Sequence, residues 1–374
     1  MNAVLELTQQ LIARRSLTPA DAGCCEVIGA RLHKAGFKLE YLNAEGVTNL
    51  WATHGSGAPL TILAGHTDVV PTGPLDQWVS DPFTPTVREG VLYGRGAADM
   101  KSGIAAMVCA AERLAAAKQI RGTLALLITS DEEGAAQHGT QQVVNVLKSR
   151  GIKPDYAIVG EATASEKLGD RITIGRRGSL GCNLKIVGKQ GHVAYPDKAD
   201  NPIHRLAAAL AELTATTWDK GNAHFPPTSF QVSNFNAGTG ANNVIPGEAT
   251  AVFNFRYGTE SSADSLKLRV SGVLERHCPQ HEAHWWHTGE PFLTRHGKLI
   301  ASAQSAIAKI TAQKPLLFTG GGTSDARFLA PWGAEVVEIG PVNDSIHKLN
   351  EHVNIADLEP LSSIYEKTLL NLFA

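Results

Sequence analysis

The sequence LTILAGHTDVVP (residues 60–71) joins a short apolar run to polar residues placed where that run ends. Residues 61–64 are typical of a buried strand, so His66 and Asp68 are expected at its carboxyl end. Side chains two positions apart in an extended chain point to the same side. A carboxylate in this position can orient a histidine whose other ring nitrogen binds a metal, although the pair also fits a structural hydrogen bond at a strand end.

A second stretch of this kind is LYGRGAADMK (residues 92–101). It places Asp99 between a short apolar strand and an alanine-rich helix expected over residues 102–117. A carboxylate at a strand-to-helix turn is well placed to bridge two metals, but it also suits a helix cap. The rest of the chain has to distinguish these alternatives.

Strands and helices alternate through the first half of the chain. Buried strands are expected at residues 122–129 and 156–159, with a helix near residues 140–150 between them. This alternation is typical of an α/β fold with a mostly parallel sheet that carries helices on both faces. Ligands bind such sheets outside the carboxyl ends of the strands.

Acidic residues follow both of these strands. Glu132 and Glu133 come after the first, and Glu161 comes after the second. One acidic turn would be ordinary, but together with His66 these residues put metal-ligating side chains at three strand ends. We therefore expect a functional site at this edge of the sheet.

The pattern changes beyond Arg177. Residues 178–290 are expected to form a separate α+β module with β-α-β-β-α-β order, a ferredoxin-like arrangement whose strand near residues 282–286 is weak. The module divides a larger, catalytic domain that comprises residues 1–177 and 291–374. We therefore expect two domains in one chain.

The larger domain resumes with elements of the same kind. Residues 320–325, GGGTSD, lack the lysine of a phosphate-binding loop, so we expect a close backbone approach to a ligand there rather than nucleotide binding. His347 lies in the loop after a strand expected over residues 335–339. An amphipathic helix over residues 355–373 closes the chain.

Composition limits the classes of function. With 374 residues, 43% of them hydrophobic, the chain can bury a sizeable core. Its 34 basic and 36 acidic residues give a formal charge of −2 without a basic tract, so nucleic-acid binding is not expected. Signal-peptide features and apolar runs of membrane-spanning length are missing, so we expect a soluble, cytoplasmic protein without membrane contact. The five scattered cysteines indicate neither a disulfide framework nor a thiolate metal site.

The strand-end residues together suit a site for two metals. They are two imidazoles and three carboxylates: His66, Asp99, Glu133, Glu161 and His347. If Asp99 bridges, each metal gains one histidine, one terminal carboxylate and a share of Asp99, and a position remains for a shared water. Nitrogen and oxygen ligands suit zinc, with cobalt or manganese as substitutes. Glu132, left over beside Glu133, is then the expected general base.

Five segments resemble the metal and base motifs of one family, in the order in which that family carries them. The segments are GHTDVVP, GRGAADMK, SDEE, GEAT and SIHKLNE. They are similar to motifs of the zinc aminoacylase and carboxypeptidase family that includes N-acetylornithine deacetylase and glutamate carboxypeptidase, and the similarity spans nearly the whole chain. The resemblance implies two zinc ions per subunit with these roles: His66 and Glu161 on one, Glu133 and His347 on the other, Asp99 bridging, Asp68 orienting His66, and Glu132 as the base.

The resemblance also implies a homodimer. Residues 178–290 would form a lid that also dimerises, and His192 of this lid would reach the active site of the partner chain. From the residues alone, His192 in the sequence GHV fits an ordinary turn histidine.

Substrate contacts are implied in the same way. Three segments favour family members that hydrolyse N-succinyl-LL-2,6-diaminopimelate to succinate and LL-2,6-diaminopimelate: GRRGSLGCNLKIVGKQGHVAYP, GANNVIPGEATAVFNFRY and FTGGGTSDARF. The matching contact residues are Arg176, Tyr195, Asn242, Asn243, Arg256, Gly322 and Thr323. Guanidinium and amide groups suit this substrate, which carries three carboxylates. Arg176 beside Arg177 also fits a solvated basic pair.

Two other functions stay open. A related N-acyl-amino-acid deacylase, such as N-acetylornithine deacetylase, or a metallo-dipeptidase would use the same metal pair. A catalytically silent binding protein on this fold would be expected to lack a metal ligand or Glu132, and all of these are present.

Overall fold

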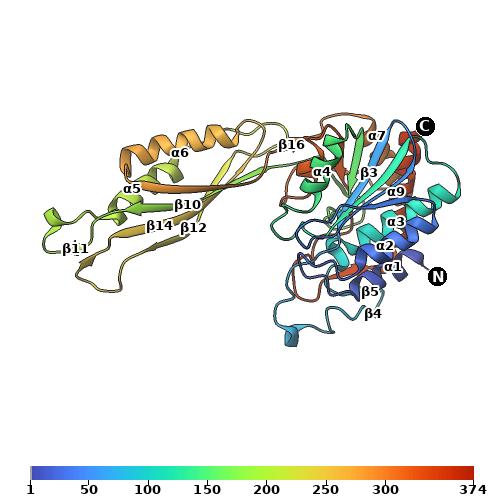
Figure 1. Cartoon of the computed structure of the whole chain (residues 1–374), viewed down its shortest axis with the longest axis horizontal. Helices are drawn as coiled ribbons and strands as arrows, with labels where there is room; N and C mark the ends of the chain where they lie inside the picture. Colours follow the sequence, from blue (N-terminus) through green and yellow to red (C-terminus); the bar gives the residue numbers. More distant parts are fainter. Residues whose placement is uncertain (1) are drawn as a thin grey trace. The chain divides into compact units, whose positions relative to one another are not determined.

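The computed structural model describes residues 2–374 and divides them into two compact units (Figure 1). The first unit comprises residues up to Gly175, Leu293–Phe318 and Ser324–Ala374, and the second comprises Arg176–Phe292 and Thr319–Thr323. The sequence pattern places the division at 177/178 and 290/291. It does not anticipate that residues 319–323, in the glycine-rich segment, lie with the second unit.

An eight-stranded sheet forms the centre of the first unit. Its order is β1 (Lys38–Tyr41), β2 (Asn49–Gly55), β6 (Thr123–Thr129), β3 (Leu60–His66), β7 (Tyr156–Val159), β18 (Glu335–Glu338), β8 (Arg171–Thr173) and β17 (Leu316–Phe318). The neighbours β6, β3, β7 and β18 run parallel, as do β8 and β17, whereas β1, β2 and β6 pair antiparallel. The mostly parallel sheet expected from the sequence is therefore confirmed. The three-residue strand β8 was not predicted.

Helices cover both faces of this sheet, as predicted. One face carries α1 (Ala3–Ile12), α2 (Cys24–Lys34), α3 (Ser102–Ala116), α7 (Lys298–Thr311) and α9 (Ile355–Phe373), and the other carries α4 (Thr140–Ser149) and α8 (Ala326–Leu329). Leu124, Leu126 and Ile128 of β6 join the core of the first group, while Ala125 and Leu127 alternate with them on the opposite face. Figure 1 shows α4 on one side of β3 and α3 with α9 on the other.

A smaller sheet supports the loops around the strand ends. It pairs β19 (His352–Asn354), β5 (Val91–Tyr93) and β4 (Thr86–Arg88), and a short helix, η1 (Leu75–Gln77), precedes it in the chain. After β5 comes the turn η2 (Ala97–Lys101), which leads into α3. This sheet brings two segments about 260 positions apart in sequence next to one another.

Close packing places the start of α3 against the end of β7. A Cβ atom on Gly103 would lie 2.3 Å from the carbonyl oxygen of Gly160, so only glycine allows this approach. Asp99 precedes Gly103 by four residues, and Glu161 follows Gly160 directly. The contact therefore brings these two carboxylates to one place.

The second unit has the predicted ferredoxin-like order. Its antiparallel sheet runs β12 (Ser229–Ala237), β14 (Glu248–Tyr257), β10 (Gly178–Val187) and β15 (His281–Gly289), with helices α5 (Pro202–Ala215) and α6 (Ala263–His277). The weakly predicted strand near residues 282–286 is the edge strand β15. The remaining short elements are β11 (Gly191–His192), which pairs with β13 (Val244–Ile245), the helix η3 (Pro196–Lys198), and β9 (Gly175–Arg176), which pairs with β16 (Phe292–Leu293) where the chain passes between the units.

Candidate metal centre

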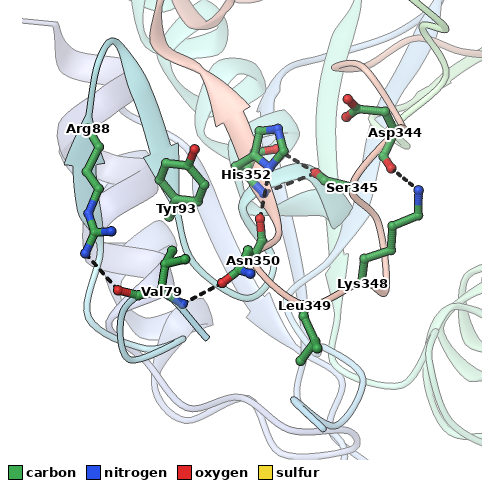
Figure 2. A pocket seen from close by; sticks show the side chains of 9 residues that line it. All are labelled: Val79, Arg88, Tyr93, Asp344, Ser345, Lys348, Leu349, Asn350 and His352. Atoms are coloured by element: carbon green, nitrogen blue, oxygen red, sulfur yellow. Dashed lines mark hydrogen bonds between the residues drawn. The ribbon is translucent and has the colours of Figure 1, made fainter. Parts of the chain in front are cut away.

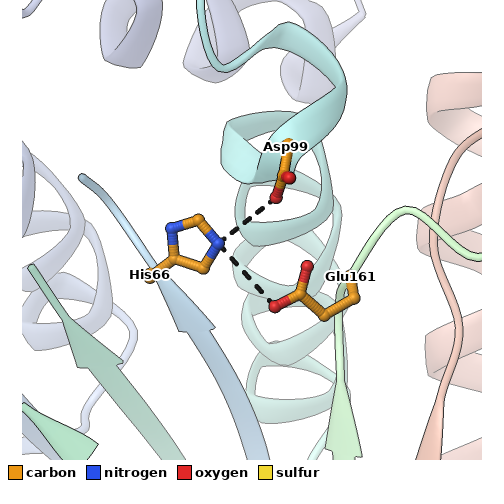
Figure 3. A group of neighbouring side chains, drawn as sticks. All are labelled: His66, Asp99 and Glu161. Atoms are coloured by element: carbon orange, nitrogen blue, oxygen red, sulfur yellow. Dashed lines mark ion pairs between the residues drawn. The ribbon is translucent and has the colours of Figure 1, made fainter. Parts of the chain in front are cut away.

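Three side chains converge at the carboxyl end of the first unit's sheet. His66 ends β3, Asp99 lies in the turn η2, and Glu161 follows β7 (Figure 3). The Nε2 atom of His66 lies 3.3 Å from Oδ1 of Asp99 and 3.7 Å from Oε1 of Glu161. The three residues are 1%, 8% and 8% exposed, respectively. Their ligand atoms are close enough to hold one metal ion.

A second group shares Asp99 with the first. The Nε2 atom of His347 lies 2.9 Å from Oε1 of Glu133 and 3.3 Å from Oδ2 of Asp99. Asp99 therefore turns one carboxylate oxygen to each histidine, the geometry of a carboxylate that bridges two metals. The histidine of this second group is exposed, whereas His66 is buried. The second group is therefore the one more open to solvent.

The environment of Asp99 fits metal ions. Its Oδ1 atom is buried and has no hydrogen-bond donor among the described residues. A buried carboxylate oxygen without a donor is costly unless a cation is near. Burial would raise the pKa of Asp99, but the nearby imidazoles of His347 and His66, each 3.3 Å from one of its oxygens, bring that pKa below its usual range. The donors are imidazole nitrogen and carboxylate oxygen, which suit zinc, cobalt or manganese.

Asp68 holds His66 through its main chain. The Nδ1–H group of His66 donates to the carbonyl oxygen of Asp68 at 2.9 Å, while the nearer carboxylate oxygen of Asp68 lies at 3.5 Å. The sequence pattern predicts the carboxylate as the partner of His66, but in the structure the carbonyl oxygen lies closer. A proton on Nδ1 leaves Nε2 free for a metal. The Asp68 carboxylate instead accepts the backbone N–H groups of Glu132 (3.3 Å) and Glu133 (3.1 Å) and so fixes the next loop.

Glu132 lies beside the site but outside both ligand groups. Burial raises the pKa of Glu132 to about 8, with further increases from Asp325 and Glu133, while His66 and Arg327 oppose the shift. A carboxylate with such a raised pKa has the basicity that a general base needs near neutral pH. Divalent cations nearby would lower this pKa.

Two further buried carboxylates, Glu351 and Asp325, lie close to these groups, and the sequence pattern predicts no role for either. Glu351 accepts hydrogen bonds from the backbone of the turn that carries Asp99. Asp325 accepts a hydrogen bond from the hydroxyl of Thr140 at 2.7 Å. The only sequence signal for Glu351 is its place at the end of the segment SIHKLNE, which also contains His347.

The remaining predicted residues all lie in the second unit, where they form two groups. Arg176 donates through Nη1 to the carbonyl oxygen of Gly322 (3.0 Å) just before β10, and Arg256 pairs in register with the second residue of β10. Thr323 follows Gly322 directly.

The other group follows the far end of β10. His192 contacts the ring of Tyr195, and the N–H group of Val193 donates to the carbonyl oxygen of Asn243 (3.1 Å), next to Asn242. The ten residues of β10 span roughly 30 Å, so the two groups lie at opposite ends of this strand, as the position of β11 in Figure 1 shows.

Sequence comparisons place the chain among metallopeptidase relatives. Residues 62–371 match the profile described as "Peptidase family M20/M25/M40". The chain is 55% identical to "Succinyl-diaminopimelate desuccinylase" of Methylococcus capsulatus over 100% of both chains. It is 56% identical to a protein of the same name from Bordetella parapertussis, over 99% of this chain and 98% of that one.

Solved structures show the same fold at lower identity. The M20 metallo-carboxypeptidase Sso-CP2 of Sulfolobus solfataricus gives a TM-score of 0.82 at 18% identity, covering 100% of this chain and 99% of that chain. The Bacillus subtilis YXEP protein, described as a dinuclear metal-binding peptidase, gives a TM-score of 0.76 at 15% identity, covering 99% and 97%.

We predict that metal binding releases protons. Hydrogen bonds to Asp99 and Glu133 raise the pKa of His347 to about 10, and hydrogen bonds to Asp68 and Asp99 outweigh burial and raise that of His66. We therefore expect both imidazoles to carry an extra proton at pH 7 in the metal-free protein, and each must lose that proton to bind a metal. Metal affinity should rise with pH across the neutral range.

The measurement is zinc titration by calorimetry at pH 7 in two buffers of different ionisation enthalpy. The two imidazoles should release about two protons, with more from Glu132 and Glu161, whose pKa values are also raised, and about one proton fewer should be released in His347→Ala. Release of no protons by the wild-type chain would show that the two imidazoles are not the ligands.

Proposed function

The chain belongs to peptidase family M20/M25/M40, and on that premise we propose that it hydrolyses the succinyl amide of N-succinyl-LL-2,6-diaminopimelate. The products are succinate and LL-2,6-diaminopimelate, a step in the synthesis of lysine and of meso-diaminopimelate. The observation that carries the proposal is the buried Asp99, which turns one oxygen to each of two histidine–carboxylate groups beside Glu132. The relatives that share more than half of the sequence over its full length carry the name of this activity.

The proposed cofactor is a pair of zinc ions in each subunit, with cobalt or manganese able to replace one. His66 and Glu161 would hold the first, Glu133 and His347 the second, and Asp99 both. When bound, such ions polarise the amide carbonyl and lower the pKa of a water molecule between them from about 15.7 to about 7.

Glu132 is the proposed proton carrier. Its carboxylate takes a proton from the attacking water as the oxygen adds to the amide carbon. It then gives the proton to the diaminopimelate nitrogen as the carbon–nitrogen bond breaks, so that a neutral amine leaves. Asp68 supports this step because its carboxylate fixes the backbone of Glu132, at 3.3 Å, and of Glu133.

The substrate contacts come from the two groups of the second unit. Arg176 and Arg256, with Gly322 and Thr323, would bind carboxylates at one end of β10. A small substrate cannot also reach His192 at the other end of the same strand, because the ends are roughly 30 Å apart.

We therefore place the second group in the active site of a partner chain. His192, Tyr195, Asn242 and Asn243 would be supplied by the other subunit of a homodimer that forms through residues 178–290. His192 would donate a hydrogen bond to the oxyanion that develops on the amide carbonyl.

The cytoplasm is the proposed location. A diaminopimelate-pathway substrate is made and used inside the cell, and the family activity needs no membrane. Of the helices in residues 2–374, none combines the length and apolar character needed to cross a bilayer.

Substrate preference is the direct test of the proposed reaction. Zinc-loaded protein should hydrolyse N-succinyl-LL-2,6-diaminopimelate with a kcat/KM at least 100-fold above those for N-acetylornithine and for a dipeptide, since only the first places three carboxylates against the arginines. A higher kcat/KM for N-acetylornithine or the dipeptide would assign the chain to a related deacylase or dipeptidase. No turnover of any of them with both metals bound would indicate a binding protein.

The adjacent residues Glu132 and Glu133 provide a matched pair of variants. Glu132→Gln keeps the shape of the side chain but cannot take a proton, so turnover should fall about 100-fold or more while two zinc ions stay bound. Glu133→Gln, the same change one residue on, should lose zinc from the group that contains His347. Zinc per chain by elemental analysis, set beside kcat, decides between them. Large zinc loss in Glu132→Gln would make Glu132 a ligand.

Complementation tests the dimeric site. Glu132→Gln disables the site in its own chain, and His192→Ala disables the site of its partner. In a mixed dimer one site keeps both residues, so refolding the two variants together should give about a quarter of wild-type activity.

A mixture of Glu132→Gln with Glu133→Gln is the control. Both changes affect the site of their own chain, so this mixture should stay near background. Activity of the first mixture no higher than that of its parents, with mixed dimers confirmed by mass, would return His192 to the role of a turn histidine.

A further inference from the structure

Glu351 is a buried carboxylate, 1% exposed, that binds the turn carrying Asp99. Its Oε1 atom accepts the backbone N–H groups of Ala98 (3.0 Å) and Asp99 (2.9 Å). Its Oε2 atom accepts the backbone N–H of Gly96 (2.9 Å) and Nη1 of Arg95 (2.8 Å). One side chain therefore fixes the main chain of the bridging residue, and the arginine balances its charge.

Gly96 allows the backbone N–H groups of this turn to point toward the single carboxylate of Glu351. This residue has a φ of +83°, and a Cβ atom there would lie 2.7 Å from Cγ1 of Val69. Glycine adopts this left-handed conformation at little cost, whereas other residues do not. The backbone N–H groups on either side of the turn then point toward Glu351.

The same glutamate belongs to the loop that carries His347. The N–H group of Gly94 donates to the main-chain oxygen of Glu351 (2.9 Å), and Nη1 of Arg95 also donates to that of Lys348 (3.2 Å). Directly after Glu351, β19 pairs with β5. The two loops that hold Asp99 and His347 are thus joined around one side chain.

Further hydrogen bonds that do not involve Glu351 also hold the loop that carries His347. Oδ1 of Asn350 accepts the N–H group of Val79 (2.7 Å), and Ser345 and His352 exchange two hydrogen bonds (2.9 and 3.1 Å). Figure 2 shows these residues on the wall of an open pocket of about 390 Å³. His347 itself has a φ of +58°, a conformation that persists in a non-glycine residue when neighbouring contacts maintain it.

We propose that Glu351 is a positioning residue of the metal centre, which sets the bridging Asp99 against His347. This inference rests on the metal centre proposed above. His66 and Glu161 extend from the core strands β3 and β7, so their placement does not need Glu351. The group formed by Asp99, Glu133 and His347 comes from loops, and it should depend on Glu351 more strongly.

The test is stepwise Co²⁺ titration of the metal-free full chain, followed by the visible absorption that reports cobalt coordination. Glu351→Gln places an amide N–H₂ where an oxygen accepts two N–H groups, and leaves Arg95 without its partner charge. The weaker of the two binding steps should lose about 10- to 100-fold in affinity, while the tighter step changes less.

Asp219 provides a matched control in the second unit. Its carboxylate also anchors a loop, accepting the backbone N–H groups of Gly221 and Thr228 (both 2.9 Å) and the hydroxyl groups of Thr228 and Ser261. Asp219→Asn should lower the free energy of unfolding in urea without changing either cobalt affinity. This control separates loss of a loop anchor in general from an effect on the metal centre.

Each outcome decides the proposal. Wild-type affinities in Glu351→Gln, or equal weakening of both steps, would overturn it. If Glu351→Gln does not fold, Arg95→Lys is judged by the same outcomes, because the lysine keeps the charge but not the planar guanidinium whose Nη1 donates to both Glu351 and Lys348. Failure of the wild-type chain to bind two cobalt ions would instead refute the metal centre.

Discussion

The structure depends on one constraint, which is the burial of the Asp99 carboxylate between two imidazoles. A buried carboxylate with an oxygen that lacks a donor is costly, and positive charge close to it offsets that cost. The histidines supply this charge when no metal is bound, because the carboxylates raise the pKa values of both. Protons and metal ions therefore compete for the same nitrogens.

Two kinds of support hold the ligands of this centre. His66 ends a strand whose every residue is buried, and Glu161 follows another buried strand, so the core of the sheet places both. Glu133 and His347 lie in loops, and hydrogen bonds to Asp68 and Glu351 place those loops. A rigid ligand group and a more open group thus share one bridging residue. The open group is where a substrate could approach without disturbing the core.

Sequence reasoning succeeds where one segment contains the whole signal. The apolar run of residues 61–64 predicts a strand, and the polar residues after it predict a site, because the end of a strand is a local property. Glu351 could not be assigned in this way, since its role consists of hydrogen bonds to a turn about 250 residues earlier in the chain. The main-chain contact of Asp68 is also invisible to a pattern of side chains. The three-residue strand β8 is too short to show a period.

The residues proposed for reactivity and those proposed for selectivity belong to different units. Every proposed metal ligand and Glu132 belong to the first unit, whereas every proposed substrate contact belongs to the second. Proteins described as a carboxypeptidase and a dinuclear metal-binding peptidase share this fold at 18% and 15% identity. One fold can therefore carry sites for different amide substrates, because amide hydrolysis needs only a polarised carbonyl and a base. In the function proposed here, selectivity for three carboxylates is assigned to the arginines at one end of β10. The length of that strand separates these arginines from the residues at its other end, which we propose act in a second chain.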